Sequence, residues 1–206
     1  MINEFDMKAL TWDDNPLFVD RSEKIAEKIR SQIPLNTEMS GFEYGCGTGL
    51  VSFNLMPYLK HITLADSSDG MLEVLRNKIL EHGVTNMDVI KSDLEVDDIP
   101  NEKYDVIFTA LTLHHINDIR VILKKFYQML NKGGYLCIAD LDLENGSFHG
   151  PEFTGHFGLS RRTMRIFFKK QGLKNINASA CYKIRRVNEQ KETYTYQIFL
   201  ITGEKI

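Results

Sequence analysis

The chain has 206 residues, of which 43% are hydrophobic and 26% are charged, and its formal net charge is −3. This balance is typical of a folded globular protein and excludes both a disordered chain and a uniformly basic nucleic-acid-binding protein. Three cysteines, none in a Cys-x-x-Cys pair, rule out a disulfide framework, and no apolar run reaches the roughly 18 residues of a membrane-spanning helix. We therefore expect no nucleic-acid partner and no membrane insertion. The acidic N-terminus lacks a signal-peptide pattern, which favours a cytoplasmic protein.

Strand-like runs alternate with segments of helical periodicity along the chain, as is typical of an α/β fold with a mostly parallel sheet. In chain order the pattern predicts a helix over 17–32, a strand over 41–44, a helix ending near Pro57, a strand over 61–65, a helix over 71–80, strands over 87–90 and 104–108, a helix over 117–130 ended by Gly133-Gly134, a strand over 135–139, a helix between Ser160 and Gly172, and strands over 175–186 and 193–202. The last two strands, joined by a polar turn at 188–191, are expected to form an antiparallel hairpin.

A glycine-rich loop, Gly45-Cys46-Gly47-Thr48-Gly49, follows the first predicted strand. Alternating glycines let the backbone turn tightly and approach a ligand closely. Asp66 and Asp93 follow the next two strands, so all three features fall on the carboxyl edge of the sheet, where open α/β sheets bind ligands. A carboxylate there can accept hydrogen bonds from both hydroxyls of a ribose. A surface turn would explain the glycine loop alone, and a helix cap would explain either aspartate alone. Neither explains why all three features lie on one edge of the sheet.

These residues carry a resemblance to a known family. Glu43-x-Gly45-x-Gly47-x-Gly49, Asp66, the Ser92-Asp93 pair and the turn over 131–134 resemble the class I S-adenosylmethionine-dependent methyltransferases. The segment 104–116 is similar to its small-molecule branch, of the methyltransferase-11 type. The resemblance implies a doubly wound, Rossmann-like sheet of seven strands with an antiparallel C-terminal hairpin. It also implies S-adenosylmethionine as cofactor, S-adenosylhomocysteine as product and a small-molecule acceptor.

The resemblance also implies roles by position. Glu43 would order the glycine loop and the amino acid end of the cofactor, Asp66 would bind the ribose hydroxyls, and Asp93 would bind the adenine amino group. Ala110 stands where many relatives have a polar residue, so a contact there must come from the backbone. Trp12 would either close over the cofactor or plug the core. The implied cofactor-binding residues are Glu43, Gly45, Cys46, Gly47, Gly49, Asp66, Ser67, Met71, Asp93, Leu94, Thr109, Ala110, Leu111 and Trp12.

Histidines are the candidate catalytic residues, because an acceptor that must lose a proton needs a base with a pKa near the working pH. His115 and His149 are the candidates, and we expect at most one of the neighbours His114 and His115 to face the cofactor. His149 lies in a glycine-rich segment, 141–159, whose counterparts in the family lie over the acceptor site. The histidines show no metal-ligand spacing on a helix, so no metal site is predicted.

Two other functions share parts of this pattern. An NAD(P)-dependent oxidoreductase would carry Gly-x-Gly-x-x-Gly, but position 50 is Leu, which disfavours that enzyme. A non-catalytic module that binds S-adenosylmethionine would show the same cofactor motifs.

We expect one methyltransferase domain over 1–206 with an N-terminal helical cap over 1–35, as a monomer or homodimer. Residues 160–191 hold ten basic side chains and one acidic one, and they form either a solvated surface or a site for an anionic acceptor or partner.

Overall fold

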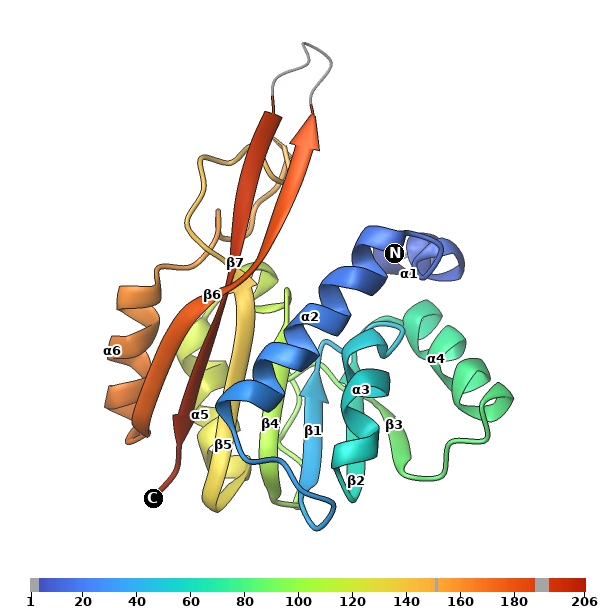
Figure 1. Cartoon of the computed structure of the whole chain (residues 1–206), viewed down its shortest axis with the longest axis vertical. Coiled ribbons are helices and arrows are strands. Elements are labelled where there is room, and N and C mark those ends of the chain that lie inside the picture. Colours follow the sequence, from blue (N-terminus) through green and yellow to red (C-terminus); the bar gives the residue numbers. More distant parts are fainter. Residues whose placement is uncertain (1–3, 151, 188–192) are drawn as a thin grey trace.

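The computed structural model describes residues 4–150, 152–187 and 193–206, in which a seven-stranded sheet carries helices on both faces (Figure 1). The strand order is β3-β2-β1-β4-β5-β7-β6. Strands β1 to β5 pair in parallel, whereas β7 is antiparallel to both β5 and β6. The strands are β1 (Ser40–Tyr44), β2 (His61–Asp66), β3 (Met87–Lys91), β4 (Tyr104–Ala110), β5 (Leu130–Leu141), β6 (Lys174–Val187) and β7 (Thr193–Glu204). The predicted mostly parallel, Rossmann-like α/β sheet with a C-terminal antiparallel hairpin is confirmed, while the predicted turn at 188–191 lies outside the described residues.

The helices divide between the two faces according to their apolar side chains. The longer helices are α2 (Pro16–Gln32), α3 (Leu50–Leu55), α4 (Asp69–Glu81), α5 (Ile119–Met129) and α6 (Arg161–Gln171). Apolar residues of α2, α3 and α4 share one buried cluster with one side of the sheet, and those of α5 and α6 share a second cluster with the other side. The strand order reverses between β1 and β4, because β2 and β3 lie on one side of β1 and β4 and β5 lie on the other. The carboxyl ends of strands at such a switch point bound the crevice in which α/β sheets bind ligands.

The end of α5 differs from the prediction. The helix ends at Met129, and strand β5 begins at once at Leu130, before the glycine pair that was expected to stop the helix. Leu130 pairs with Tyr104, and the register then shifts before regular pairing resumes. Gly134 lies inside this irregularity, where a Cβ would come within 2.9 Å of a backbone carbonyl oxygen. Gly134 therefore permits a close backbone approach within the strand, whereas Gly133 has a positive φ of 82° and open space around it, and neither glycine caps the helix.

Within the helical cap predicted over 1–35, residues 4–11 form two short elements whose bounds were not predicted, helix α1 (Glu4–Lys8) and the 3-10 helix η1 (Ala9–Thr11). Asp6 holds this segment against the start of α4, because its carboxylate accepts hydrogen bonds from Ser68 Oγ at 2.5 Å and from the Gly70 N–H at 2.9 Å. Figure 1 shows α1 beyond the carboxyl ends of the strands, on the same side as the glycine loop. The segment thus reaches the ligand edge of the sheet.

Two further 3-10 helices connect elements at the sheet edges, η2 (Met56–Tyr58) and η3 (Leu113–His115). The hairpin of β6 and β7 extends past the sheet (Figure 1), because β5 pairs with β7 only from Ile198 onward. Over the described ranges, we find no helix with the length and apolar character needed to cross a membrane.

Candidate functional site

A cavity of about 910 Å³ opens at the carboxyl ends of β1, β2, β3 and β4. Its size is near the upper end of the range for ligand pockets, about 300–1,000 Å³. The N-terminal segment, helix α2, the segment after β5 and the tip of β6 complete its walls. The residues selected from the sequence that line it are Trp12, Glu43, Gly45, Cys46, Gly47, Asp66, Ser67, Met71, Asp93, Ala110, Leu111, His115 and His149.

Three residues of the expected cofactor set do not line the cavity. Gly49 directly precedes α3 as its N-cap, and the Cβ it lacks would come within 2.6 Å of Leu75, so this glycine permits helix packing. The side chains of Leu94 and Thr109 are buried. Because neighbouring residues of a strand face opposite sides, Ala110 lines the cavity while Thr109 does not. The backbone donor expected at Leu94 stays a prediction.

Asp66 fixes the shape of the glycine loop. One carboxylate oxygen accepts a hydrogen bond from the Gly47 N–H at 2.8 Å, and the other accepts one from the Ser68 N–H at 2.9 Å. The N–H of Gly45 also donates to the Ala65 carbonyl at 2.8 Å, so the loop is tied to the end of β2 twice. Burial raises the pKa of Asp66, although these backbone donors favour its ionised form.

Glu43 lies beneath the glycine loop with only 2% of its surface exposed. The Ser52 hydroxyl donates a hydrogen bond to its carboxylate. Burial raises the pKa of Glu43 to about 8, so the carboxyl group is mostly protonated at pH 7 when no cation is beside it. A positively charged group brought into the cavity beside Glu43 would favour its ionised form.

Asp93 lies at the end of β3, where its carboxylate accepts hydrogen bonds from the Glu95 N–H at 2.9 Å and from the Tyr44 hydroxyl at 3.4 Å. These contacts orient the carboxylate at the wall of the cavity. Asp66 and Asp93 therefore both face the cavity from neighbouring strand ends, as the sequence pattern predicts.

The N-terminal segment forms one wall and is anchored by a second aspartate. Asp13 accepts a hydrogen bond from Thr48 Oγ1 at 2.5 Å and pairs with Lys78 Nζ at 2.6 Å. Trp12 packs between the rings of Phe5 and Phe18, with centroid distances of 6.1 and 4.7 Å. Of the two positions considered for Trp12, the structure shows the cavity wall rather than the core.

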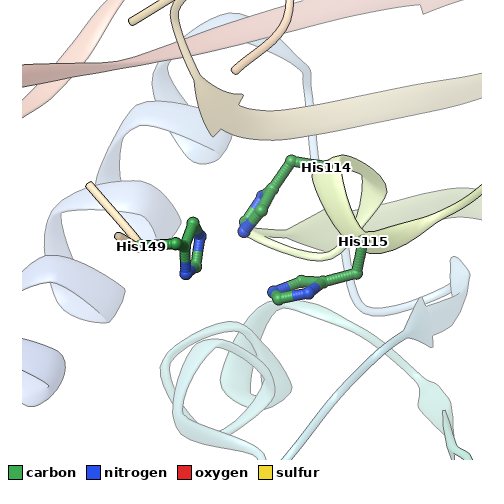
Figure 2. A group of neighbouring side chains, drawn as sticks. All are labelled: His114, His115 and His149. Atoms are coloured by element: carbon green, nitrogen blue, oxygen red, sulfur yellow. The ribbon is translucent and has the colours of Figure 1, made fainter. Parts of the chain in front are cut away.

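Three histidines lie close together in the part of the cavity that is walled by η3 and by the segment after β5. His114 and His115 come from η3, and His149 comes from the segment after β5 (Figure 2). The ring centroids lie 4.2 Å apart for His114 and His115, 5.0 Å for His114 and His149, and 5.3 Å for His115 and His149. Both neighbours line the cavity, whereas the sequence predicted that at most one of them faces the cofactor. Neighbours on a 3-10 turn point about 120° apart, and the cavity wraps around this turn.

Buried Asp140 orients the first of these rings. Its carboxylate lies 2.6 Å from His114 Nδ1 and accepts a hydrogen bond from the Leu113 N–H at 2.9 Å. Burial lowers the pKa of His115 and of His149 to about 4, and the neighbouring histidines act in the same direction. Both rings are therefore neutral at pH 7, with one ring nitrogen each able to accept a hydrogen bond or bind an ion. His156 lies outside the cavity lining, and its Nε2 is 2.9 Å from the Ile116 carbonyl oxygen.

Two arginines lie at the cavity wall. The sequence pattern did not single out Arg21, and it included Arg186 only as part of the basic segment 160–191. Arg21 comes from α2, and its Nε is buried without a hydrogen-bond partner among the described residues. Burial lowers the pKa of Arg21 to about 10, so it stays charged at neutral pH. Arg186, at the tip of β6, lies with its guanidinium carbon 4.0 Å from the ring centroid of Phe148. No motif links these arginines, which are distant in sequence.

The basic segment is only partly a solvated surface. Arg161 pairs with Asp142, with Nε 2.7 Å from one carboxylate oxygen, and Arg165 donates hydrogen bonds to the carbonyls of Ile176 and Ala178 at 3.0 and 3.1 Å. These side chains thus tie α6 to the segment after β5 and to β6.

Comparisons with known proteins agree with this geometry. A family described as a methyltransferase domain matches residues 42–138. A malonyl-[acyl-carrier protein] O-methyltransferase of Priestia megaterium is 30% identical over 98% of this chain and 78% of its own length. An uncharacterised methyltransferase of Schizosaccharomyces pombe is 28% identical over 82% of this chain and 67% of its own length. The crystal structure of a SAM-dependent methyltransferase from Aquifex aeolicus superposes with a TM-score of 0.65 at 17% identity, covering 88% of this chain and 89% of that one. The family match includes the glycine loop and ends before Asp140 and His149.

Proposed function

Because the chain belongs to the class I S-adenosylmethionine-dependent methyltransferases, we propose that it methylates a small-molecule acceptor bound at the histidine end of the same cavity. The observation that carries this proposal is the continuity of the cavity. It extends from Asp66 and Asp93 at the strand ends, past the glycine loop, to the histidines and to Arg21. A donor and an acceptor can therefore lie in one cavity, whose volume suits a small molecule better than a polymer.

The residues of the strand-end half fit the cofactor. At Gly47 the atom nearest to an added Cβ is Met71 Sδ at 3.9 Å, so the loop backbone can approach a ligand there, whereas the Thr112 side chain fills the corresponding space at Gly45. Asp66 keeps its carboxylate at the wall, and we propose that it binds the ribose hydroxyls, while Asp93 binds the adenine amino group. Glu43, whose pKa is raised by burial, suits the ammonium of the cofactor's amino acid end, since that cation favours the ionised carboxylate.

When bound, S-adenosylmethionine supplies a methyl group already activated by its sulfonium. The protein then needs mainly to hold the acceptor in line and to exclude water, and orientation alone can lower a barrier by about 7–11 kcal/mol. We call the part of the cavity around the three histidines the acceptor half. Phe5, Phe18 and Phe153 line this half and limit access of water. We propose His115 and His149 as the groups that accept a proton from an acceptor that must lose one, as their neutral rings allow.

We further propose that the acceptor carries an acidic group. Arg21 is charged and has a buried Nε without a partner among the described residues, and a buried donor left in this state costs about 1–3 kcal/mol. An anionic ligand would relieve that cost. The Priestia megaterium relative, by its name, methylates an oxygen of a malonyl group, which is itself an acid.

We propose that residues 1–206 form one domain, in which 1–35 cap the cavity and 141–159 wall the acceptor site.

The cofactor half is tested by calorimetric titration with S-adenosylmethionine, S-adenosylhomocysteine and NAD in parallel. We expect micromolar binding of both sulfur ligands and none of NAD. The acceptor half is tested with methyl-labelled cofactor and paired acceptors that differ only in an acidic group, such as a malonyl thioester and its monomethyl ester. Transfer to the free acid but not to the ester supports the proposal. Equal transfer to neutral analogues would contradict the acidic acceptor, and binding of NAD alone would contradict the cofactor site.

A further inference from the structure

We propose that His114, His115 and His149 form a binding site for a divalent transition-metal ion, with Zn²⁺ the best match, at the acceptor end of the cavity. This inference departs from the sequence-based expectation of no metal, and it does not depend on the proposed methyl transfer. Figure 2 shows the three rings around a common space, with His149 facing the other two from the opposite side.

The spacing of the ring nitrogens fits one ion. One nitrogen from each histidine can be chosen so that all lie within 4.8 Å of one another. Zn–N bonds of about 2.0–2.1 Å place tetrahedral ligand atoms about 3.4 Å apart. The ring nitrogens would therefore need to approach one another by at most about 1.4 Å to hold the ion.

Asp140 provides the support that a metal-binding histidine needs. Its wholly buried carboxylate lies 2.6 Å from His114 Nδ1, and its other oxygen is held by the Leu113 N–H. An ionised carboxylate in this position requires the proton on Nδ1, which leaves Nε2 free to bind an ion on the cavity side. Histidines that bind metals usually donate their second ring N–H to such a carboxylate or to a carbonyl.

The other two rings are held by aromatic neighbours rather than by hydrogen bonds. Phe5 meets His115 edge-on at 5.4 Å, and Phe153 stacks on His149 at 4.0 Å. Within the described residues we find no hydrogen bond to either ring, so their nitrogens remain available. This packing orients the rings without using the atoms that would bind a metal.

The chemistry of the cluster selects the type of ion. Three imidazoles suit Zn²⁺, Cu²⁺, Ni²⁺ or Fe²⁺, whereas Mg²⁺ and Ca²⁺ require oxygen ligands. Three protein ligands also leave a fourth tetrahedral position open, as in catalytic zinc sites. That position would face the cavity, where water or an acidic oxygen of the acceptor can occupy it.

The test uses untagged protein from which metals have been removed with a chelator. Calorimetry with ZnCl₂ gives stoichiometry and affinity, and the visible absorption of added Co²⁺ reports four-coordinate geometry. MgCl₂ serves as the ion that the site should reject. The variants are His115→Gln and His149→Gln, and His156→Gln is the matched control because His156 lies outside the cluster and Gln can keep its contact with Ile116. Thermal unfolding and S-adenosylhomocysteine binding are measured on the same samples, so loss of fold or of the cofactor site is recognised separately.

We expect one Zn²⁺ per chain in the wild type and in His156→Gln, with no binding of Mg²⁺. Loss of a supporting residue alone weakens metal sites by about 10–100-fold, so loss of a ligand in His115→Gln or His149→Gln should weaken Zn²⁺ binding at least as much. Absence of one-to-one binding in the folded wild type would overturn the site. So would unchanged Zn²⁺ affinity in both cluster variants, or equal loss in the control.

Discussion

The two halves of the cavity are built in different ways. The strand-end half comes from one stretch, 43–71, together with Asp93, and its shape depends on the backbone of the glycine loop and the N–H groups bound by Asp66. The acceptor half is made of side chains from four separated segments: the N-terminal region with α2, the end of β4 with η3, the loop after β5, and the tip of β6. The first half therefore has a sequence signature, and the second acquires its chemistry only when the chain folds.

Thr112 joins the two halves. Its hydroxyl lies 3.4 Å from the Gly45 carbonyl and 3.2 Å from the Ala110 carbonyl, so the glycine loop and the end of β4 share one contact. A change at this contact should disturb both halves, whereas changes elsewhere should affect one half only. The predictions below use this difference.

The largest effect is expected for Gly45→Ala, with Gly47→Ala as its matched control. Both glycines have positive φ, at 68° and 52°, but an added Cβ at Gly45 would overlap Thr112, while at Gly47 its nearest neighbour is Met71 Sδ at 3.9 Å. Left-handed backbone costs about 1–2 kcal/mol and overpacking about 1–3 kcal/mol more. Gly45→Ala should therefore lower the free energy of unfolding by about 2–5 kcal/mol, and Gly47→Ala by about 1–2 kcal/mol. Equal losses in urea denaturation would contradict the role given to Thr112.

The next effect concerns the cofactor half alone. Asp66→Ala removes the acceptor of the Gly47 and Ser68 N–H groups and the proposed ribose contact. S-adenosylhomocysteine affinity should fall by about 1.5–3 kcal/mol, the usual loss for charged hydrogen bonds. Asp88→Ala, which changes an exposed carboxylate on neighbouring β3, is the control. Calorimetry that gives unchanged affinity in Asp66→Ala would contradict the ribose assignment.

A change in the acceptor half should leave the cofactor half untouched. Arg21→Gln removes the charge proposed to meet the acidic acceptor, so KM for that acceptor should rise about tenfold, equivalent to roughly 1.4 kcal/mol. S-adenosylhomocysteine affinity should stay at the wild-type value. Lys24→Gln, on an exposed position of the same helix, is the control. Steady-state kinetics in which Arg21→Gln alters only the cofactor affinity would refute the division into two halves.

The smallest effect is a pH dependence that arises from Glu43. Its pKa is about 8 in the folded protein and near 4.5 in the unfolded chain, so between these values the unfolded state binds fewer protons and stability falls as pH rises. Glu43→Gln removes this contribution. The free energy of unfolding of the variant minus that of the wild type should therefore increase by about 1 kcal/mol from pH 6 to pH 7 without ligand. Histidines that titrate in this range cancel in the difference, and a flat difference would show that Glu43 is ionised in the folded state.

The sequence predicted the fold and much of the cofactor half, since both depend on local patterns. Asp66 could be placed because a strand, a glycine loop and another strand fix its position at the sheet edge. The role of Gly133-Gly134 was mispredicted because Gly134 serves a close backbone approach inside β5, where a Cβ would come within 3.0 Å of the Asp105 carbonyl oxygen on the neighbouring strand β4. The residues around Gly133-Gly134 in the sequence do not identify β4 as the neighbouring strand.

The histidine cluster shows the limit of local patterns more clearly. His149 follows His115 by more than thirty residues, and Asp140 supports His114 from the next strand of the sheet. None of these separations matches a helical or strand spacing, so only the parallel pairing of β4 with β5 brings the groups together. Arg21 was missed for the same reason, and Arg186 was recognised only as part of the basic segment 160–191, because each looks like a surface charge until its neighbours are known.

A crystal structure with S-adenosylhomocysteine bound tests the division of the cavity most directly. We expect the ribose hydroxyls within hydrogen-bond distance of Asp66, the adenine amino group near Asp93, and the sulfur facing the histidine cluster. Adenosine bound among the histidines, or a ribose without contact to Asp66, would contradict the assignment of the two halves.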